Sequence, residues 1–155
     1  MKLYVKATEV PSITYYRAVP KGKNPLTFQW YELGIHCGSL EQAQYFAENK
    51  ECDIYKIELN SDVNFSNPVS DFEEWTSAEC LDEILNIGFN IDISRAQIIQ
   101  DLRNKVWTKE TAAEYVIDKV GSSAVVKYNN EIELNEEDII ILDESDIKSV
   151  NKLGG

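Results

Sequence analysis

Three short segments combine residue types that could bind a phosphorylated ligand and act on it. In the first, Arg17 stands in the middle of the apolar segment 15–19. A guanidinium placed there costs free energy unless an anion meets it. Its planar fork suits a phosphate or a carboxylate, so Arg17 is a candidate ligand-binding residue. The alternative is a structural salt bridge between Arg17 and one of the many acidic residues of the chain.

The second segment, residues 34–43, has His36, Gly38 and Ser39 directly before an expected helix. A glycine at this position lets a ligand approach the backbone closely. The free amides at the start of a helix favour a negative group. His36 and Ser39 could both donate hydrogen bonds to a ribose or an amide. The alternative is an ordinary turn between a strand and a helix.

The third segment is an acidic loop that leads into the apolar run 139–142. Asp138 or Glu137 would stand at the start of this strand, and Glu131 and Glu133 lie shortly before it. A carboxylate held rigidly beside a ligand could stabilise positive charge on a ribose while its glycosidic bond breaks. The alternative is a solvated acidic turn.

The elements that must position these residues follow from hydrophobic periodicity and capping. Alternating apolar residues predict strands over residues 3–7, 13–19 and 53–59. Residues 20–33 contain turn formers and predict a loop. Ser39 and Gln42 form a capping box, which predicts a helix with Leu40, Ala43 and Phe46 on one face.

The second half of the chain is expected to be helical and then to return to strands. Capping residues predict helices near 77–87, 95–104 and 109–120. Strands are expected over 124–128 and 139–142, and the second is apolar on both faces, so it should be central in its sheet. This order does not alternate as a doubly wound fold does. It predicts one α+β domain spanning 1–155, with a helical insertion near residues 76–120.

The three segments, in this order, resemble the ADP-ribosyltransferase fold. Members carry an Arg or His on the first core strand, a Ser, Thr or Tyr motif before a helix, and an acid at the start of a later strand. Arg17, the stretch Gly34–Ser39 and Asp138 or a neighbouring Glu would match. Residues 125–131 and 139–149 look like the end of such domains in phage proteins and bacterial toxins. The resemblance covers residues 13–59 and 122–150, and it implies a core of two small packed β-sheets.

The resemblance implies an enzyme that binds NAD and transfers ADP-ribose to a macromolecular target, a protein above all. Arg17, His36, Gly38 and Ser39 would contact NAD, and Asp138 or Glu137 would be catalytic. The register leaves the acid open, because Glu131 and Glu133 form the Glu-x-Glu pattern of arginine-modifying members. Such a protein would suit a phage or bacterial effector directed at a host or defence protein. The alternative is an inactive acidic module of the same fold that blocks a basic partner.

Composition and missing motifs narrow the function classes. The net charge of −12 argues against nucleic-acid and anionic-membrane binding. A single histidine rules out multi-histidine metal sites, and no metal is expected. Three cysteines without paired spacing should all be free thiols, as in a reducing cytoplasm. No phosphate-binding loop, nucleophile elbow or dinucleotide fingerprint is present.

Overall fold

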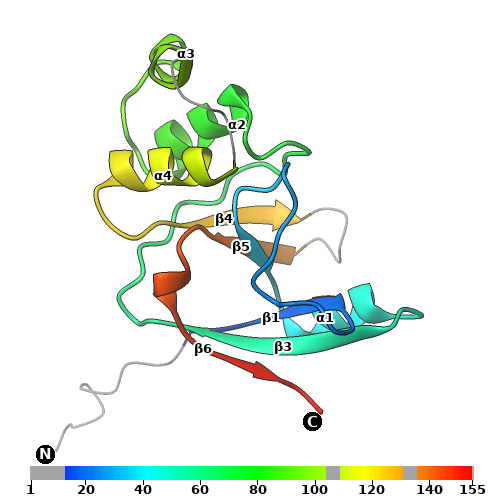
Figure 1. The fold of residues 1–155 in the computed structure, drawn as a ribbon. Coiled ribbons are helices and arrows are strands. Elements are labelled where there is room, and N and C mark those ends of the chain that lie inside the picture. The colour runs from blue at the N-terminus through cyan, green and yellow to red at the C-terminus, as the bar shows by residue number, and fades with distance from the viewer. Residues whose placement is uncertain (1–12, 104–108, 131–135, 155) are drawn as a thin grey trace, which may run out of the picture.

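The computed structural model describes residues 13–103, 109–130 and 136–154. Two three-stranded antiparallel sheets form the centre of the molecule (Figure 1). The lower sheet has the order β1-β3-β6 and consists of Ile13–Pro20, Cys52–Leu59 and Ile147–Lys152. The upper sheet has the order β2-β5-β4 and consists of Ile35–Cys37, Glu136–Ile141 and Val125–Asn130. The expected α+β class is therefore confirmed.

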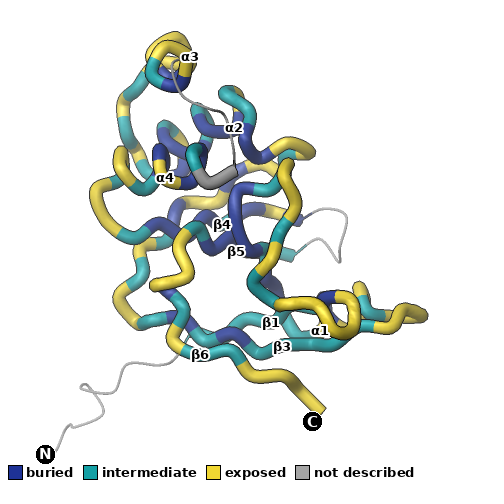
Figure 2. The backbone as a smooth tube through the Cα atoms, viewed as in Figure 1, coloured by how far each residue is buried: buried dark blue, intermediate teal, exposed yellow. Residues whose placement is uncertain are grey.

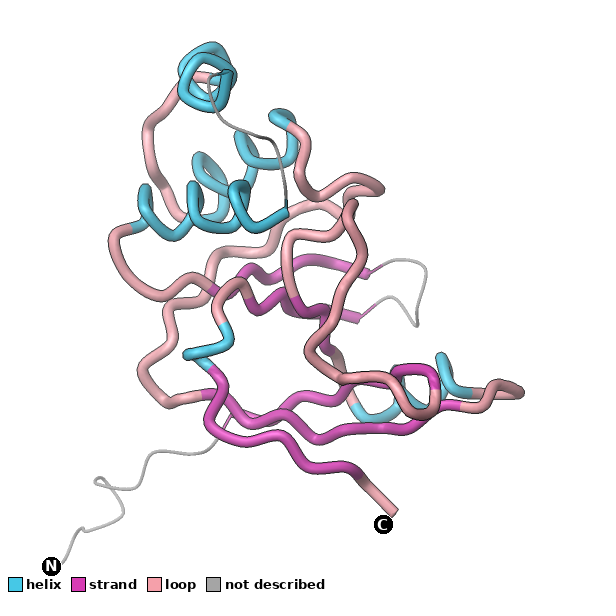
Figure 3. Tube along the Cα trace, in the orientation of Figure 1, coloured by secondary structure: helices cyan, strands magenta, loops and turns pink. Residues whose placement is uncertain are grey.

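Helices cover the face of the upper sheet that points away from the lower one (Figures 1 and 3). They are α2 (Ala78–Glu83), the π-helical turn η2 (Ile84–Gly88), α3 (Arg95–Arg103) and α4 (Lys109–Val120). Their apolar side chains pack with those of β4 and β5 in one core that includes Leu85, Ile98, Val116, Val126 and Ile140. The predicted helical insertion is confirmed.

A second core fills the space between the two sheets. It contains Ile57 and Leu59 of the lower sheet and Ile35, Ile139 and Ile141 of the upper sheet. Strand β5 thus contributes to both cores, and residues 138–141 are all buried (Figure 2). This confirms the expectation that the apolar run is a central strand. The strand begins earlier than predicted, at Glu136, which places Asp138 inside the strand rather than at its mouth.

Helix α1 (Leu40–Ala47) lies at one end of the lower sheet and begins with the predicted capping box. The Ser39 hydroxyl accepts a hydrogen bond from the Gln42 amide at 3.1 Å. The Gln42 side chain accepts one in return from the Ser39 amide at 3.0 Å. Two donors at the helix start are satisfied in this way, so the local sequence fixes where the chain turns from β2 into the helix.

The two sheets meet along β1 and β2. Tyr16 and Gly38 form an antiparallel bridge in which the amide of each residue donates to the carbonyl of the other, at 2.8 and 2.9 Å. Strand β6 was not predicted, and the strand expected over residues 3–7 lies outside the described residues. The three cysteines are free, as expected. Within the described chain, no helix has the length and apolar character needed to cross a membrane.

Candidate functional site

A cleft of ≈ 680 Å³ opens where the two sheets meet. The loop between β1 and β2 borders it, together with β1, β2, α1 and the edge of the upper sheet. Arg17, His36, Gly38 and Asp138 all line it, although they come from sequence positions far apart. The predicted gathering of Arg17, Gly38 and Asp138 around one cleft is therefore confirmed. The volume is in the range of about 300–1,000 Å³ usual for small-molecule sites.

The guanidinium of Arg17 is anchored by backbone carbonyls. Its two terminal nitrogens donate to the carbonyl of His36 at 2.7 Å and to that of Thr27 at 2.6 Å. No described carboxylate lies within ion-pair distance of Arg17, so the salt-bridge alternative is wrong for the described chain. Its buried Nε has no hydrogen-bond partner among the described residues. Arg17 therefore brings a positive charge to the cleft, and its Nε donor is unused.

His36 is held against two aromatic rings and is neutral at physiological pH. Its Nδ1 lies 2.9 Å from the hydroxyl of Tyr128, and Trp75 packs edge-on against its ring. Burial, and then the nearby charge of Arg17, lower the pKa of His36 from 6.5 to about 3. The carboxylate of Glu32 is 3.9 Å from Nε2, which has no hydrogen-bond partner in the described structure. Depending on its tautomer, Nε2 of the neutral imidazole can donate a hydrogen bond to a ligand or accept one from it.

Gly38 leaves room for two polar side chains. A Cβ atom on this residue would collide with Oε1 of Gln42 and would lie 2.6 Å from Oδ1 of Asp138. Its backbone at the same time forms the bridge to Tyr16 that joins the sheets. The glycine thus lets a carboxylate, an amide and the sheet junction share one small volume.

Asp138 is a buried carboxylate in the wall of the cleft. Only 4% of its surface is exposed, and its Oδ2 accepts a hydrogen bond from the side-chain amide of Asn130 at 2.9 Å. It stands opposite Tyr128 in the β4–β5 pair, which puts both side chains on the same face of the sheet. Its negative charge raises the pKa of the Cys37 thiol, although burial is the main cause and Arg17 acts in the opposite direction.

Two predicted site residues do not line the cleft. The hydroxyl of Ser39 donates to Oε1 of Glu136 at 2.7 Å and caps helix α1. Ser39 therefore has a structural role beside the cleft. Glu137 precedes Asp138 on the strand and points to the other face, where its carboxylate lies 3.8 Å from the Lys127 ammonium. Of the two acids proposed as catalytic, only Asp138 reaches the cleft. Glu131 and Glu133 lie outside the described residues.

The structure adds residues that were not predicted as ligand-binding. Lys23 brings a second positive charge to the cleft, and Tyr128 brings a hydroxyl beside His36. Aromatic side chains line the cleft as well, namely Phe28, Tyr31 and Phe46. Trp30 and Tyr45, which are exposed aromatic residues of the same part of the chain, do not line the cleft. Lys23 and Phe28 lie in the loop of residues 21–34, and a loop's path cannot be read from periodicity.

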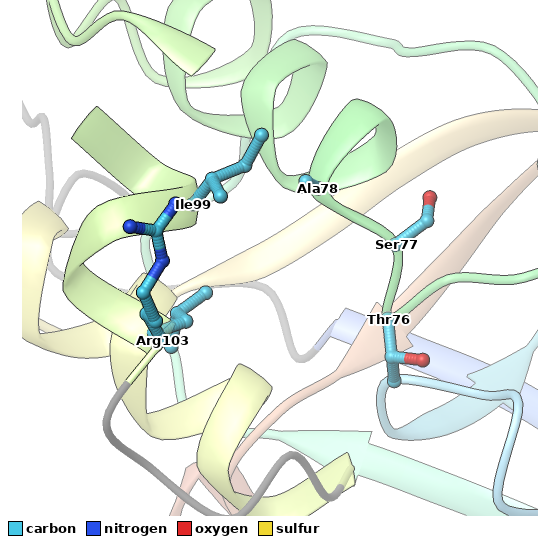
Figure 4. Close-up of a pocket in the computed structure, with 6 residues that line it drawn as sticks. Thr76, Ser77, Ala78, Ile99 and Arg103 are labelled. Carbon is cyan, nitrogen blue, oxygen red and sulfur yellow. The ribbon is translucent and has the colours of Figure 1, made fainter. Parts of the chain in front are cut away.

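A separate hollow of ≈ 320 Å³ lies in the helical layer. Ile99 and Arg103 of α3 stand there across from Thr76, Ser77 and Ala78 at the start of α2 (Figure 4). None of the predicted site residues lines it. In the described part of the chain, no three His, Cys, Asp or Glu side chains are grouped so that they could hold a metal ion.

Comparison with known proteins does not place the chain in a family. No model of a known protein family matches it, nor does any characterised protein or solved structure. The function must therefore be argued from the cleft itself.

Proposed function

We propose that the cleft binds NAD and that the protein is a mono-ADP-ribosyltransferase. The observation that carries the proposal is the meeting of Arg17, His36, Gly38 and Asp138 in one cleft. These residues were selected from the sequence for their resemblance to the site of that enzyme class. Their convergence requires β1, β2 and β5 to come together, which the order of residues alone does not guarantee.

Unused polar groups in the cleft fit a phosphorylated ribose ligand. Arg17 Nε and His36 Nε2 are buried and have no hydrogen-bond partner among the described residues, which is costly without a ligand. Arg17 and Lys23 supply the positive charge that a pyrophosphate requires. Phe28, Tyr31 and Phe46 supply aromatic surface on which flat rings can stack.

We assign the role of catalytic carboxylate to Asp138. NAD would supply an ADP-ribosyl group and, as leaving group, nicotinamide, which departs with the electron pair of the bond to the ribose. A fixed negative charge at Asp138 stabilises the positive charge that the ribose acquires as this bond breaks. The nucleophile of the acceptor then forms the new bond and gives up its proton. Because Asn130 holds Oδ2, the orientation of the carboxylate is set before any ligand arrives.

Neutral His36 and Tyr128 would position the ligand. The pKa of about 3 keeps His36 uncharged, so it does not repel the positive charge that develops nearby. The hydrogen bond to Tyr128 and the contact with Trp75 fix the imidazole ring in one orientation. Gly38 leaves the space that the side chains of Asp138 and Gln42 occupy in the wall of the cleft.

The alternative function is a binding module without catalysis, and one observation favours it. Both terminal nitrogens of the Arg17 guanidinium already donate to backbone carbonyls, so part of its hydrogen-bonding capacity is used within the protein. An arginine used in this way can serve mainly to tie the loop at Thr27 to the sheets. The acidic surface would then act on a basic partner.

Asp138→Asn, compared with Glu137→Gln, tests the proposal. The two residues are neighbours on β5, but only Asp138 faces the cleft. Release of nicotinamide from NAD by the purified protein should fall about a hundredfold in Asp138→Asn. It should stay close to wild type in Glu137→Gln. The same comparison is made with cell extract added as a source of acceptor.

Binding is measured separately, through thermal unfolding with and without NAD. NAD at a hundred times its dissociation constant should raise the free energy of unfolding by about 2.7 kcal/mol. Protection by NAD without nicotinamide release would contradict the enzymatic part and support the binding module. No protection and no release, even at millimolar NAD, would contradict the proposal as a whole.

A further inference from the structure

A second hollow of ≈ 520 Å³ lies on the other side of the loop that borders the cleft. Thr27 and Phe28 line both the cleft and this second hollow, so they form a wall between the two. The second hollow, here called the acidic groove, extends from this wall to α4 and to the turn that follows β5. Of the residues proposed to bind or act on NAD, it contains Phe28 alone, which lines both the cleft and this groove.

The floor of the acidic groove is apolar. Side chains of Leu26, Ile117 and Leu142 are only partly buried and form this floor together with Phe28 and buried Ile141. These residues belong to three different parts of the chain, so the apolar surface is continuous across the loop, α4 and the end of β5. A contiguous exposed apolar surface with a polar rim is typical of an interaction site.

The rim carries only negative charge. Glu114 of α4 and Asp143 and Glu144 of the turn after β5 stand around the floor, and no lysine or arginine of the described residues lines the groove. None of these three carboxylates forms an ion pair within the described structure. The adjoining turn has the same character, because burial and then the charges of Asp143 and Asp62 raise the pKa of buried Asp146.

We infer that the acidic groove binds a basic amphipathic segment of a partner protein, with apolar side chains on the floor and Lys or Arg on the rim. Apolar contacts would supply most of the affinity, and the rim charges would orient the segment and speed its association. The net charge of −12 extends the attraction beyond the groove. An acidic or purely polar segment would meet three unpaired carboxylates and an apolar floor, and would be rejected.

The test uses a short synthetic peptide with leucines one helical turn apart and lysines at the other positions. Its binding to the full-length protein is followed by fluorescence anisotropy at low salt. Two matched peptides serve as controls: one carries glutamate in place of each lysine, and the other serine in place of each leucine. The first peptide should bind and both controls should not, because charge and apolar contact are both required.

Charge reversal then locates the site. Glu114→Lys combined with Glu144→Lys should weaken binding about tenfold and reduce its salt dependence. The control reverses two exposed acids outside the groove, Glu73→Lys with Asp92→Lys, and changes the net charge equally. It should have a much smaller effect. Equal weakening by both pairs would show general attraction to an acidic protein and would overturn the inference, as would failure of the peptide to bind.

A variant of the floor separates apolar contact from charge. Ile117→Ser should weaken peptide binding, whereas Ile99→Ser, at an exposed isoleucine of α3 outside the groove, should not. Thermal unfolding shows whether either variant has lost its fold. None of these changes touches a residue that lines the cleft, so protection by NAD should be unaltered. Loss of peptide binding and loss of NAD binding are thus separate results.

Discussion

The two sheets differ sharply in how far they are buried. The upper sheet is covered on one face by helices and on the other by the lower sheet, and four consecutive residues of β5, from Asp138 to Ile141, are buried. In the lower sheet, Val19 is the one buried residue of β1, and β6 has no buried residue. Figure 2 shows this contrast along the chain. The cleft lies at the junction and takes residues from both sheets.

The difference shows how each side of the cleft is held in place. Asp138, His36 and Tyr128 stand on the packed sheet, where close packing leaves a side chain little freedom. Arg17 comes from the more open sheet, and hydrogen bonds to two carbonyls hold it there instead. Packing on one side and polar contacts on the other therefore define the site. Substitutions can separate these two ways of positioning a residue.

Gly34→Ala and Gly38→Ala should give the largest effects, and both test how tightly the surroundings of β5 are packed. A Cβ on Gly34 would collide with the backbone carbonyl of Ile141, which the packed sheet holds in place. A Cβ on Gly38 would collide with side-chain atoms of Gln42 and Asp138, and a side-chain end shifts at a smaller cost than a backbone carbonyl. We expect Gly34→Ala to lower the free energy of unfolding by about 3 kcal/mol and Gly38→Ala by about 1–2 kcal/mol. Urea denaturation measures both.

Gly88→Ala is the control for these two substitutions. A Cβ atom on Gly88 would lie 3.2 Å from Cβ of Ser66, which is a tight contact rather than a collision. It should therefore cost less than either of the other changes. A larger loss for Gly38→Ala than for Gly34→Ala would contradict the expectation that a clash with the backbone of β5 costs more than a clash with side chains.

His36, on the packed upper sheet, should make the free energy of unfolding fall at acid pH. Its pKa is about 3 in the folded protein and 6.5 when unperturbed, so the unfolded chain takes up a proton first as the pH falls. The stability that the neutral imidazole contributes is complete above pH 6.5 and is lost between 6.5 and 3. At about pH 4.5 the loss should be about 2–3 kcal/mol relative to pH 7.

His36→Gln is less stable at neutral pH but lacks this loss. The free energy of unfolding, measured by urea at several pH values, should therefore converge for wild type and variant as the pH falls. Carboxylates titrate in both proteins, and the difference between the two curves isolates His36. Parallel curves would mean that His36 is not buried as a neutral group.

Arg17→Lys tests the polar contacts on the open side. An ammonium cannot reproduce the fork that joins the carbonyls of His36 and Thr27, so we expect a loss of about 1–2 kcal/mol. Arg95→Lys is the matched control, because Arg95 is exposed and bonds Asp82 at 2.9 Å on the surface. It should change stability by less than about 0.5 kcal/mol. Equal effects would show that the carbonyl contacts of Arg17 do not hold the loop.

The reactivity of the three thiols tests the same contrast between the packed upper sheet and the more open lower sheet, and it can be measured on the wild-type protein. Cys37 and Cys80 are buried, and burial is the first cause that raises the pKa of each, for Cys37 to about 12. Cys52 begins β3 in the open sheet and is partly exposed. A thiol reagent at mildly alkaline pH should label one cysteine quickly, and Cys52→Ser should abolish the fast phase. A second fast thiol in the folded protein would show that one of the cores opens readily.

Most of the secondary structure could be predicted from local patterns. The capping residue Ser39 marks the start of α1, and the apolar run at 139–142 identified a central strand. A helix was expected to begin near residue 77, and α2 begins at Ala78 with Ser77 as its N-cap. Strand β6 escaped prediction because its sequence mixes apolar and polar residues without clear alternation. Its pairing with β3 is decided by tertiary contacts, which a local pattern does not contain.

The site was only partly accessible from sequence. Arg17, His36, Gly38 and Asp138 could be selected because each residue type is unusual in its local setting. Ser39 and Glu137 were selected by the same reasoning, yet one caps a helix and the other faces away. Whether a side chain points into a cleft depends on strand register, and a shift of one residue reverses its face. Lys23 lies in the cleft because of the path of the loop, and Tyr128 because of the pairing of β4 with β5. Neither feature is visible in a local sequence pattern.

The bridge between Tyr16 and Gly38 has a consequence for hydrogen exchange. Each of these amides donates to the carbonyl of the other residue, so neither can be exposed to solvent while the bridge remains closed. Separation of the sheets frees both protons in a single event. When closing is faster than chemical exchange, the protection factor of each amide is the reciprocal of one shared opening constant. The exchange rates of these two amides therefore both report how often the sheets separate. A ligand that holds the sheets together slows the exchange of both amides by the same factor.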